Sequence, residues 1–496
     1  MVRFSRAFSG GGVIADALID LPAVLETEIC IAGAGPAGIV LALELAARGR
    51  RVLLLEGGGM EAAGAGDDAY HGEVMGRPYP LAGSRLRWLG GTSNHWGGWV
   101  RPLDAFDFVD KPHFPLPAWP FGPETLAPWY GPAAHWCEVG TTEYDPIRAG
   151  LEGHSALLPL SEADGFVNRL FRFSPPTRFG ERYRSALAAT ENLDCRVHLN
   201  LVQLLEGDGR IRQAVARTLD GGECRISAQS YVLALGGVEN ARMLLNQAGM
   251  PGQHADLVGR CFMDHYGYRP GLLLASADLQ YAQFQHQGQS LMPVLAPSPE
   301  LILSERLHNA CMVLGASAPD AQLPAEYLGQ SPFMAWDAKD AKSLRWIQMI
   351  NEPLPHPDSR ITLGTDEDAL GLRRLRLHWH LDAGDFERVF ALAEKWGRVV
   401  GSTHLGRFRW TRRTVTPPTQ APGVGMHHMG TTRMSARPEF GVVDPDCRIW
   451  DQENLFVAGS SVFPTAGFSN PTLTIVALAC RLAAHLDHDR TGGSDG

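Results

Sequence analysis

The stretch Glu28–Glu56, which reads EICIAGAGPAGIVLALELAARGRRVLLLE, decides the fold. Its first five residues predict a buried β-strand, and the glycine-rich run Gly33–Gly38 that follows predicts a tight turn. An amphipathic helix that ends at Gly49 comes next, and residues 51–56 predict a second buried strand. The stretch therefore predicts a complete βαβ unit.

The glycines and the final acid of this unit fit a dinucleotide-binding fingerprint. Gly33 permits the turn, Gly35 lets the backbone approach a pyrophosphate, and Gly38 lets the helix pack closely on the strand. Glu56 lies 18 residues beyond Gly38, where a carboxylate can bind the hydroxyls of a ribose. A lone G-x-G-x-x-G pattern is a weak signal, but here the strands, the helix and the acid all occur where the fingerprint requires them. The fingerprint alone does not separate NAD from FAD.

Later segments return the chain to the same sheet. Residues 197–217 predict a β-hairpin, and residues 230–240 predict a strand that enters a glycine turn before a helix. Residues 454–461 predict another buried strand, and the run NPT at 470–472 opens a helix that continues to about residue 486. The nucleotide-binding sheet is therefore expected to be assembled from separated segments.

The predicted fold class is α/β (α+β overall), with a Rossmann-like domain built from discontinuous segments and a sheet-based substrate-binding domain. The segments without βα alternation, which are richer in proline, tryptophan and charge, are assigned to the second domain. The predicted ranges are 26–124, 191–269 and 421–488 for the first domain, 125–190 and 270–420 for the second, and 489–496 for a disordered tail.

The composition excludes several classes of protein. With 496 residues and 45% hydrophobic side chains the chain can bury a large core, and its net charge of -10 disfavours nucleic acid as a partner. No apolar run approaches the roughly 20 residues of a membrane span, and residues 1–26 do not form a signal peptide, so we expect a cytoplasmic protein. Eight scattered cysteines predict reduced, mostly buried thiols. His378 and His380 can share a strand face, but no acid or cysteine joins them at ligand spacing, so no metal site is expected.

Three blocks carry a resemblance to a known family. They are the βαβ unit, the loop Gly90–Gly98 (GGTSNHWGG), and the C-terminal pair His427–Met434 (HHMGTTRM) with Pro464–Thr474 (PTAGFSNPTLT). Together they resemble the glucose-methanol-choline (GMC) oxidoreductases over about residues 27–487, nearest the pyranose oxidase and bacterial C-glycoside oxidase branch. The resemblance implies FAD, a secondary hydroxyl of a pyranose sugar or glycoside as substrate, and oxygen, a quinone or a redox protein as electron acceptor. Non-sugar alcohols, a non-redox lyase or decarboxylase, and a non-catalytic flavin protein remain alternatives.

Oxidation of an alcohol requires a base for the hydroxyl proton while the hydride passes to the flavin N5. His427 matches the family's catalytic histidine, since an imidazole with a pKa near 6.5 suits this role. His428 is expected to point elsewhere, and either histidine could instead be a buried structural residue. Asn470 matches the second catalytic position, where an amide can orient the hydroxyl, and it could also cap the helix that begins at Pro471.

The resemblance also implies the cofactor contacts. His95 occupies the position that bonds covalently to the flavin in the pyranose oxidase branch, or it packs against the ring without a bond. Val202 matches a hairpin position whose backbone meets the adenine, and the helix N-terminus at residue 472 would stabilise a reduced ring. The full predicted set is Gly33, Gly35, Gly38, Glu56, Gly91, Thr92, Asn94, His95, Trp96, Gly97, Val202, Ala234, Gly459, Ser460, Asn470, Pro471 and Thr472.

Overall fold

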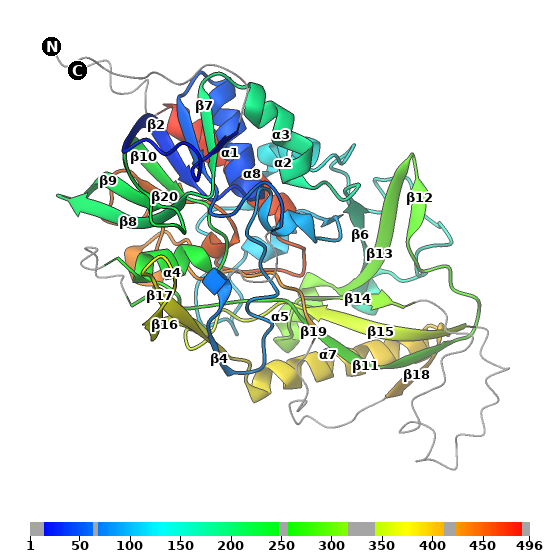
Figure 1. The fold of residues 1–496 in the computed structure, drawn as a ribbon. Helices are drawn as coiled ribbons and strands as arrows, with labels where there is room; N and C mark the ends of the chain where they lie inside the picture. Colours follow the sequence, from blue (N-terminus) through cyan, green and yellow to red (C-terminus); the bar gives the residue numbers. More distant parts are fainter. Residues whose placement is uncertain (1–13, 63–67, 248–255, 316–342, 411–422, 489–496) are drawn as a thin grey trace.

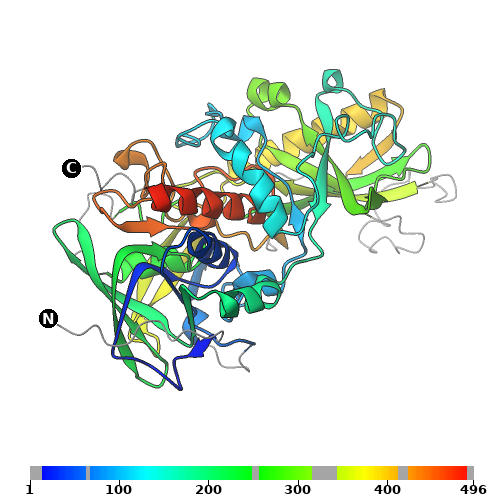
Figure 2. The ribbon, with the colours of Figure 1, turned by 90° about the horizontal axis from the view of Figure 1, so that it is seen from above.

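The computed structural model describes residues 14–62, 68–247, 256–315, 343–410 and 423–488. Three β-sheets and the helices packed on them make up this part of the chain (Figure 1). The first sheet lies on one side of the molecule and the second sheet with its long helix on the other (Figure 2). Residues 489–496, expected to be a tail, lie outside the described residues.

The first sheet contains the predicted βαβ unit. Its central strands are parallel to their neighbours, and β8 and β9 form the predicted antiparallel hairpin at one edge. The order across the sheet is β1 (Ala15–Asp16), β7 (Leu193–Val197), β3 (Val52–Leu55), β2 (Val24–Ala32), β10 (Glu223–Leu233), β9 (Arg210–Arg217) and β8 (Asn200–Gly207), with β20 (Leu455–Val457) beside β10.

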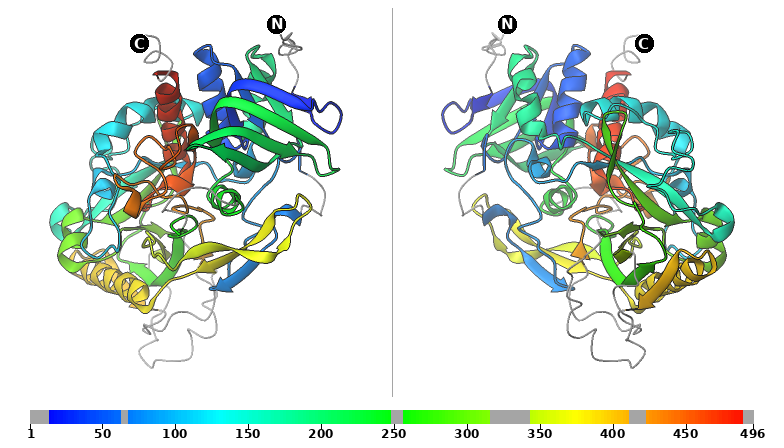
Figure 3. Two further views of the ribbon diagram at one scale, coloured as in Figure 1. Left: turned by 90° about the vertical axis from the view of Figure 1, so that its left-hand side faces the viewer. Right: turned by 90° about the vertical axis from the view of Figure 1, so that its right-hand side faces the viewer.

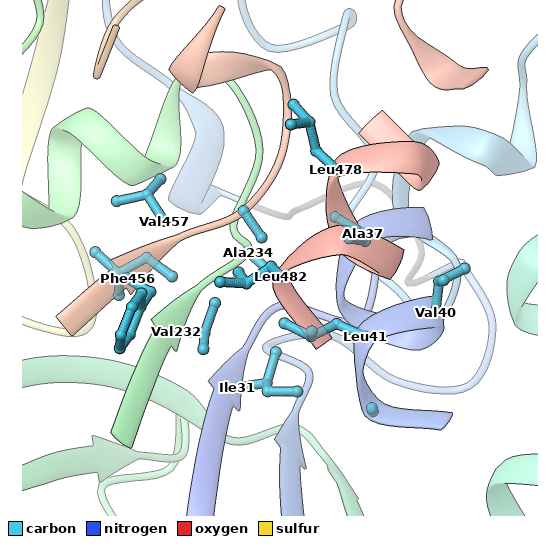
Figure 4. Packing of buried hydrophobic residues seen from close by; sticks show 14 of the residues in the cluster. Ile31, Ala37, Val40, Leu41, Val232, Ala234, Phe456, Val457, Leu478 and Leu482 are labelled. Carbon is cyan, nitrogen blue, oxygen red and sulfur yellow. The ribbon is translucent and has the colours of Figure 1, made fainter. Parts of the chain in front are cut away.

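Two helices pack against each other and against this sheet, namely α1 (Pro36–Ala47) and α8 (Thr472–His488). Figure 4 shows side chains of both helices meeting the apolar strand residues, with Leu41 of α1 and Leu482 of α8 in the same cluster. Each such side chain, fully buried, contributes about 1.5–3 kcal/mol to folding. This packing holds the glycine turn after β2 and the N-terminus of α8 at the same end of the sheet.

The second sheet is larger and mainly antiparallel. Helix α7 (Ala383–Ser402) covers one face with an apolar stripe, in which Trp396 meets Phe166 edge-on at 5.5 Å between ring centroids. Short helix α5 (Pro299–Glu305) follows β13. The order is β18 (Gly406–Trp410), β11 (Tyr266–Ala275), β15 (Ser343–Asn351), β14 (Ala310–Leu314), β13 (Gln289–Pro297), β6 (Phe166–Phe173) and β5 (Trp99–Val100), with β12 (Phe284–His286) on β13 and β19 (Gly423–Val424) on β11.

A third, three-stranded sheet has the order β16 (Arg360–Glu367), β17 (Arg373–Trp379) and β4 (Glu73–Gly76). Helix α4 (Glu239–Leu245) lies between this sheet and the first one (Figure 3). The third sheet shares the hydrophobic core under α7, to which it contributes Leu377 and Trp379. It therefore connects the two larger sheets.

The predicted fold class is confirmed. Two helices from residues 125–190 nevertheless pack on the first core, because α2 (Pro123–Trp136) contacts α8 and α3 (Phe179–Ala189) contacts α1. Strands β4 and β5, from residues 26–124, pair with the third and second sheets instead. The chain thus crosses between the sheets more often than the predicted ranges suggest.

All eight cysteines are buried and unpaired, as expected. Within the described ranges, no helix has the length and apolar character needed to cross a membrane.

Candidate functional site

A cavity of about 890 Å³ runs from the glycine turn after β2 to the C-terminal histidines. This volume lies in the upper part of the range of roughly 300–1,000 Å³ that ligand pockets occupy. Gly33 and Gly35 line one end, and His427 and Asn470 line the other. The fold therefore joins the predicted nucleotide fingerprint to the predicted catalytic residues in one continuous space.

The glycine turn has the geometry that its predicted role requires. Gly33 has φ +105°, and a Cβ atom there would lie 2.4 Å from the Ala234 carbonyl oxygen. A Cβ atom at Gly38 would lie 1.9 Å from the Gly33 carbonyl oxygen, so only glycine allows α1 this close to the turn. At Gly35 a Cβ atom would meet nothing within 4 Å, and the backbone borders open cavity. Glu56 is buried and accepts hydrogen bonds from the Ala34 and Gly58 amides at 3.1 and 2.9 Å.

His427 lies in a chain of hydrogen bonds between two segments that are far apart in the sequence. Its Nδ1 is 2.8 Å from Nδ1 of His265, and Nε2 of His265 donates to the Gly467 carbonyl oxygen at 2.9 Å. On the other side of the ring, Nε2 of His427 is 3.3 Å from Nδ2 of Asn470. The loop before α8 thus contributes both Gly467 and Asn470 to the surroundings of one imidazole.

A buried carboxylate positions the backbone of His427. Asp264 accepts hydrogen bonds from the His427 and Met426 amides at 2.7 and 3.1 Å, and from the Tyr79 hydroxyl at 2.8 Å. Both oxygens are occupied in this way, and neither bonds the His427 ring. Asp264 therefore fixes the backbone that carries the His427 ring, but its carboxylate does not contact the ring as a countercharge.

Burial sets the charge of these groups. It lowers the pKa of His427 well below 6.5, with smaller contributions from His265 and His428, and it lowers the pKa of His265 to about 4. It also raises the pKa of Asp264 to about 7 against the effect of its hydrogen-bond donors. At neutral pH both rings of the chain are uncharged, so His427 is able to accept a proton.

His428 borders the same cavity but its ring has another partner. Its Nε2 is 3.0 Å from the Ser84 hydroxyl, and its ring packs near Tyr79 and Phe262. Burial lowers its pKa to about 3. The carbonyl oxygen of His428 accepts a hydrogen bond from Ser460 at 2.6 Å, which ties this segment to the turn after β20.

The loop Gly90–Gly98 borders the cavity through His95, whose pKa is lowered by burial and by the nearby Arg178 cation. Trp96 also lines the cavity, while its indole nitrogen donates to the Thr177 carbonyl oxygen at 2.8 Å. Asn94 does not line it, because its amide donates to the Leu89 carbonyl oxygen at 3.0 Å and faces a separate depression.

Most of the predicted cofactor residues line the cavity, and three do not. Gly38 packs helix against turn, Asn94 points away, and Val202 is buried against Val215 and Leu370. Asn200 and Leu201 line the cavity where Val202 was expected. The predicted residues that line it are Gly33, Gly35, Glu56, Gly91, Thr92, His95, Trp96, Gly97, Ala234, Gly459, Ser460, Asn470, Pro471 and Thr472.

Sequence reasoning missed His265, Asp264 and Tyr79. Asp264 and His265 directly follow the apolar run Cys261–Met263. Two titratable side chains at the start of a buried strand are unusual, and this was the sequence signal for a functional role. Nothing local connects that pair to His427, which is 162 positions away. Only the three-dimensional arrangement brings them together.

Comparison with known proteins adds three findings. Residues 355–479 match the sequence model of the family described as GMC oxidoreductase. The 2-methyl-1,2-propanediol dehydrogenase of Mycolicibacterium austroafricanum is 26% identical over 549 aligned residues, covering 93% of this chain and 95% of that protein. A C-glycoside 3-oxidase of Arthrobacter globiformis is 36% identical over 131 residues, which are 26% of this chain and 24% of that one.

Among solved structures, a pyridoxine 4-oxidase from Mesorbium loti aligns with a TM-score of 0.54 at 18% identity. The alignment covers 93% of this chain and 99% of that chain. At this identity the likeness shows a shared fold.

Proposed function

Because this chain is a GMC oxidoreductase acting on CH–OH groups, we propose that it uses FAD to oxidise a secondary hydroxyl of a pyranose sugar or glycoside to a ketone. One observation carries the catalytic part of the proposal, the hydrogen-bond chain from the Gly467 carbonyl through His265 to His427. This chain leaves an unprotonated ring nitrogen beside Asn470 in the cavity.

The proton positions follow from the partners. A carbonyl oxygen only accepts, so Nε2 of His265 carries a proton, and Nδ1 of that neutral ring holds a lone pair. Nδ1 of His427 must then be the donor in the bond between the two rings. Since His427 is neutral, its Nε2 holds a lone pair, which faces the Asn470 amide here and is the site that accepts the hydroxyl proton.

Asn470 orients the substrate in this proposal. Its amide lies 3.3 Å from Nε2 of His427, so a hydroxyl that bonds to the amide also lies within reach of that nitrogen. An amide does not accept a proton at neutral pH, which leaves His427 as the base. The substrate oxygen would thus sit between the two side chains, with its carbon facing the cofactor.

The residues present fit FAD. The cavity extends from the glycine turn to the loop around His95. In the turn, Gly33 packs tightly against Ala234, whereas the backbone at Gly35 borders free space. Gly33, Gly35 and Glu56 would hold the pyrophosphate and ribose, and His95, Trp96 and the N-terminus of α8 would border the ring. When bound, FAD supplies the acceptor for the hydride.

We propose that FAD is held without a covalent bond and that His95 packs beside the ring. His95 lines the cavity in a neutral state, which is compatible with either arrangement. Acid precipitation of the yellow protein decides between them. Yellow colour in the supernatant is expected, and a yellow pellet would establish the covalent bond instead.

Two observations favour different alcohols. The C-glycoside 3-oxidase match supports a sugar, but it spans 24% of that protein. The 2-methyl-1,2-propanediol dehydrogenase match spans 95% of its protein and supports a small non-sugar alcohol as the second candidate. The polar side chain of Gln348 on β15 lines the cavity in addition to His427 and Asn470, and can bind a further hydroxyl of a polyol.

The test is anaerobic mixing of the FAD-loaded protein with a panel of pyranoses, C-glycosides, 2-methyl-1,2-propanediol and simple alcohols. Bleaching of the flavin by a sugar or glycoside, with a ketone identified in the product by NMR, is the expected result. Bleaching by the diol alone would favour the second candidate. A flavin that stays oxidised with every alcohol, in a protein that retains FAD, would contradict oxidation of CH–OH groups under this proposal.

A further inference from the structure

A second group of histidines and acids lies away from the cavity. His356 is in the loop between β15 and β16, His380 directly follows β17, and Asp382 is the N-cap of α7. One ligand atom from each of these residues lies within 4.8 Å of the other two. None of the three lines the cavity described above. The antiparallel pairing of β16 with β17, followed directly by the start of α7, places two imidazoles and a carboxylate together.

The distances in this group suit a shared ion better than hydrogen bonds. Nε2 of His356 is 3.6 Å from Oδ2 of Asp382 and 3.4 Å from Oδ2 of Asp385, and this buried nitrogen has no hydrogen-bond partner. Zinc bound tetrahedrally at about 2.0–2.1 Å from each ligand separates its ligand atoms by about 3.3 Å. The separation of His356 from Asp382 is close to that value, and the ligand atom of His380 lies within 4.8 Å of both.

The start of α7 orients the carboxylates. Oδ1 of Asp382 accepts from the Asp385 amide at 2.9 Å, and Oδ2 of Asp385 accepts from the Asp382 amide at 2.8 Å. This reciprocal cap leaves Oδ2 of Asp382 directed at His356. A helix N-terminus carries about half a positive charge and the nearby Arg388 carries one, and the two carboxylates together still exceed this sum. The local charge is therefore compatible with a cation.

Unsatisfied polar atoms behind the group point to a missing ligand. His308 and Asp385 are both completely buried. Neither ring nitrogen of His308 nor Oδ1 of Asp385 has a hydrogen-bond partner, although Nε2 of His308 lies 3.3 Å from that oxygen. Buried polar groups are normally satisfied, so this cluster is incomplete as a hydrogen-bond network. His308 would hold Asp385 in place behind the ligands.

We propose that His356, His380 and Asp382 bind one Zn²⁺ ion. Two imidazoles and one carboxylate are a nitrogen–oxygen set that zinc accepts, whereas Ca²⁺ and Mg²⁺ require oxygen ligands. Asp382 is partly exposed, so water completes the coordination. The ion joins the loop before β16, the end of β17 and the start of α7. Because the ligands lie outside the cavity, this proposal does not rest on the proposed oxidation.

The sequence suggests that His378 and His380 act together, but in the structure their rings have different partners. Their ring centroids are 6.0 Å apart, and Nδ1 of His378 is bound to the Asp358 carbonyl oxygen at 2.9 Å. His378→Ala is therefore a matched control that removes a neighbouring imidazole from the same strand region without removing a ligand. His356→Ala also removes a partner of Asp385, so His380→Ala is the variant with less effect on folding.

The experiment is calorimetric titration of ZnCl₂ into FAD-loaded protein that has been dialysed against a chelator. Wild type and His378→Ala are expected to bind one equivalent, and His380→Ala and His356→Ala to lose at least about 10²-fold in affinity. Zinc should raise the melting temperature of wild type and not of His380→Ala, and MgCl₂ should give no heat. Absence of saturable binding in wild type, or equal binding in His380→Ala, would overturn the proposal. Flavin bleaching by substrate is expected to be the same with and without zinc. A negative result in the zinc titration would therefore contradict the metal site alone, and a negative result in the bleaching assay would contradict the proposed oxidation alone.

Discussion

Among the described residues, a buried histidine cluster around His427 and a partly buried one around His356 use acidic residues in opposite ways. Around His427 the buried acid Asp264 bonds backbone amides and a tyrosine, and it leaves both imidazole rings without a countercharge. Around His356 the acids face the ring, and the Asp385 carboxylate, 3.4 Å from Nε2 of His356, raises the pKa of that ring above 6.5. Burial in the first cluster lowers the pKa of His427 far below that value.

This difference decides what each cluster can do. An imidazole kept neutral by burial, with its tautomer fixed by a neighbour, is ready to accept a proton. An imidazole surrounded by carboxylates favours a positive charge, which a proton or a metal ion can supply. The number of histidines does not distinguish a base from a cation site, whereas the direction of the nearest carboxylate does.

The largest effect is expected from His427→Ala. The variant should bind FAD and lose about 10²–10⁴-fold in the rate of substrate-driven flavin reduction, since it removes the base. Single-turnover bleaching under anaerobic conditions measures this. His428→Ala is the control, because its ring bonds Ser84 and not the His265 chain. If His428→Ala were the slow variant and His427→Ala near wild type, the base would be the other histidine.

His265→Leu tests whether the neighbouring ring sets the tautomer. Leucine cannot accept the His427 Nδ1 proton, so the lone pair of His427 is no longer confined to Nε2, and we expect a loss of about 10²-fold in flavin reduction. His265→Asn places an acceptor oxygen near the former Nδ1 and should recover much of the rate. Equal rates in the two variants would show that His265 fills space only.

Asn470→Ala should cost less, about tenfold, because the amide contributes orientation that other contacts partly supply. Its effect should not add to that of His427→Ala, since both side chains act on one hydroxyl. The double variant, measured in the same single-turnover assay, is expected to match His427→Ala. Fully multiplied losses would mean that Asn470 acts elsewhere.

The sequence predicts the first region better than the second for a physical reason. The βαβ unit, the hairpin at 197–217 and the helix from 472 depend on local periodicity and glycine positions, so their approximate positions are predictable. His265 lies 162 positions from His427 and His356 lies 24 positions from His380, and local periodicity does not predict such contacts. Val202 shows the limit on a smaller scale, because Asn200 and Leu201 of the same strand line the cavity while Val202 packs in the core, and local periodicity does not fix where the hairpin meets the cavity.

The smallest effect is expected from pH, and it tests the charge assigned to the first cluster. A base must be neutral to act, so the rate of flavin reduction rises as pH increases through the pKa of His427 and is constant above it. Because burial places that pKa well below 6.5, the rate at saturating substrate should change between pH 5.5 and 9 by much less than the roughly tenfold that an imidazole with a pKa near 6.5 would give.

Within the part of the chain that the structure describes, Asp264, with a pKa of about 7, is the group in contact with His427 that can titrate within this window. It touches the backbone and not the ring, so any step near pH 7 that it causes should vanish in Asp264→Asn. A rise approaching tenfold per pH unit below about pH 6 that persists in Asp264→Asn would instead assign His427 an ordinary pKa. In that case burial would not hold its ring neutral, and the contrast between the two histidine clusters would be lost.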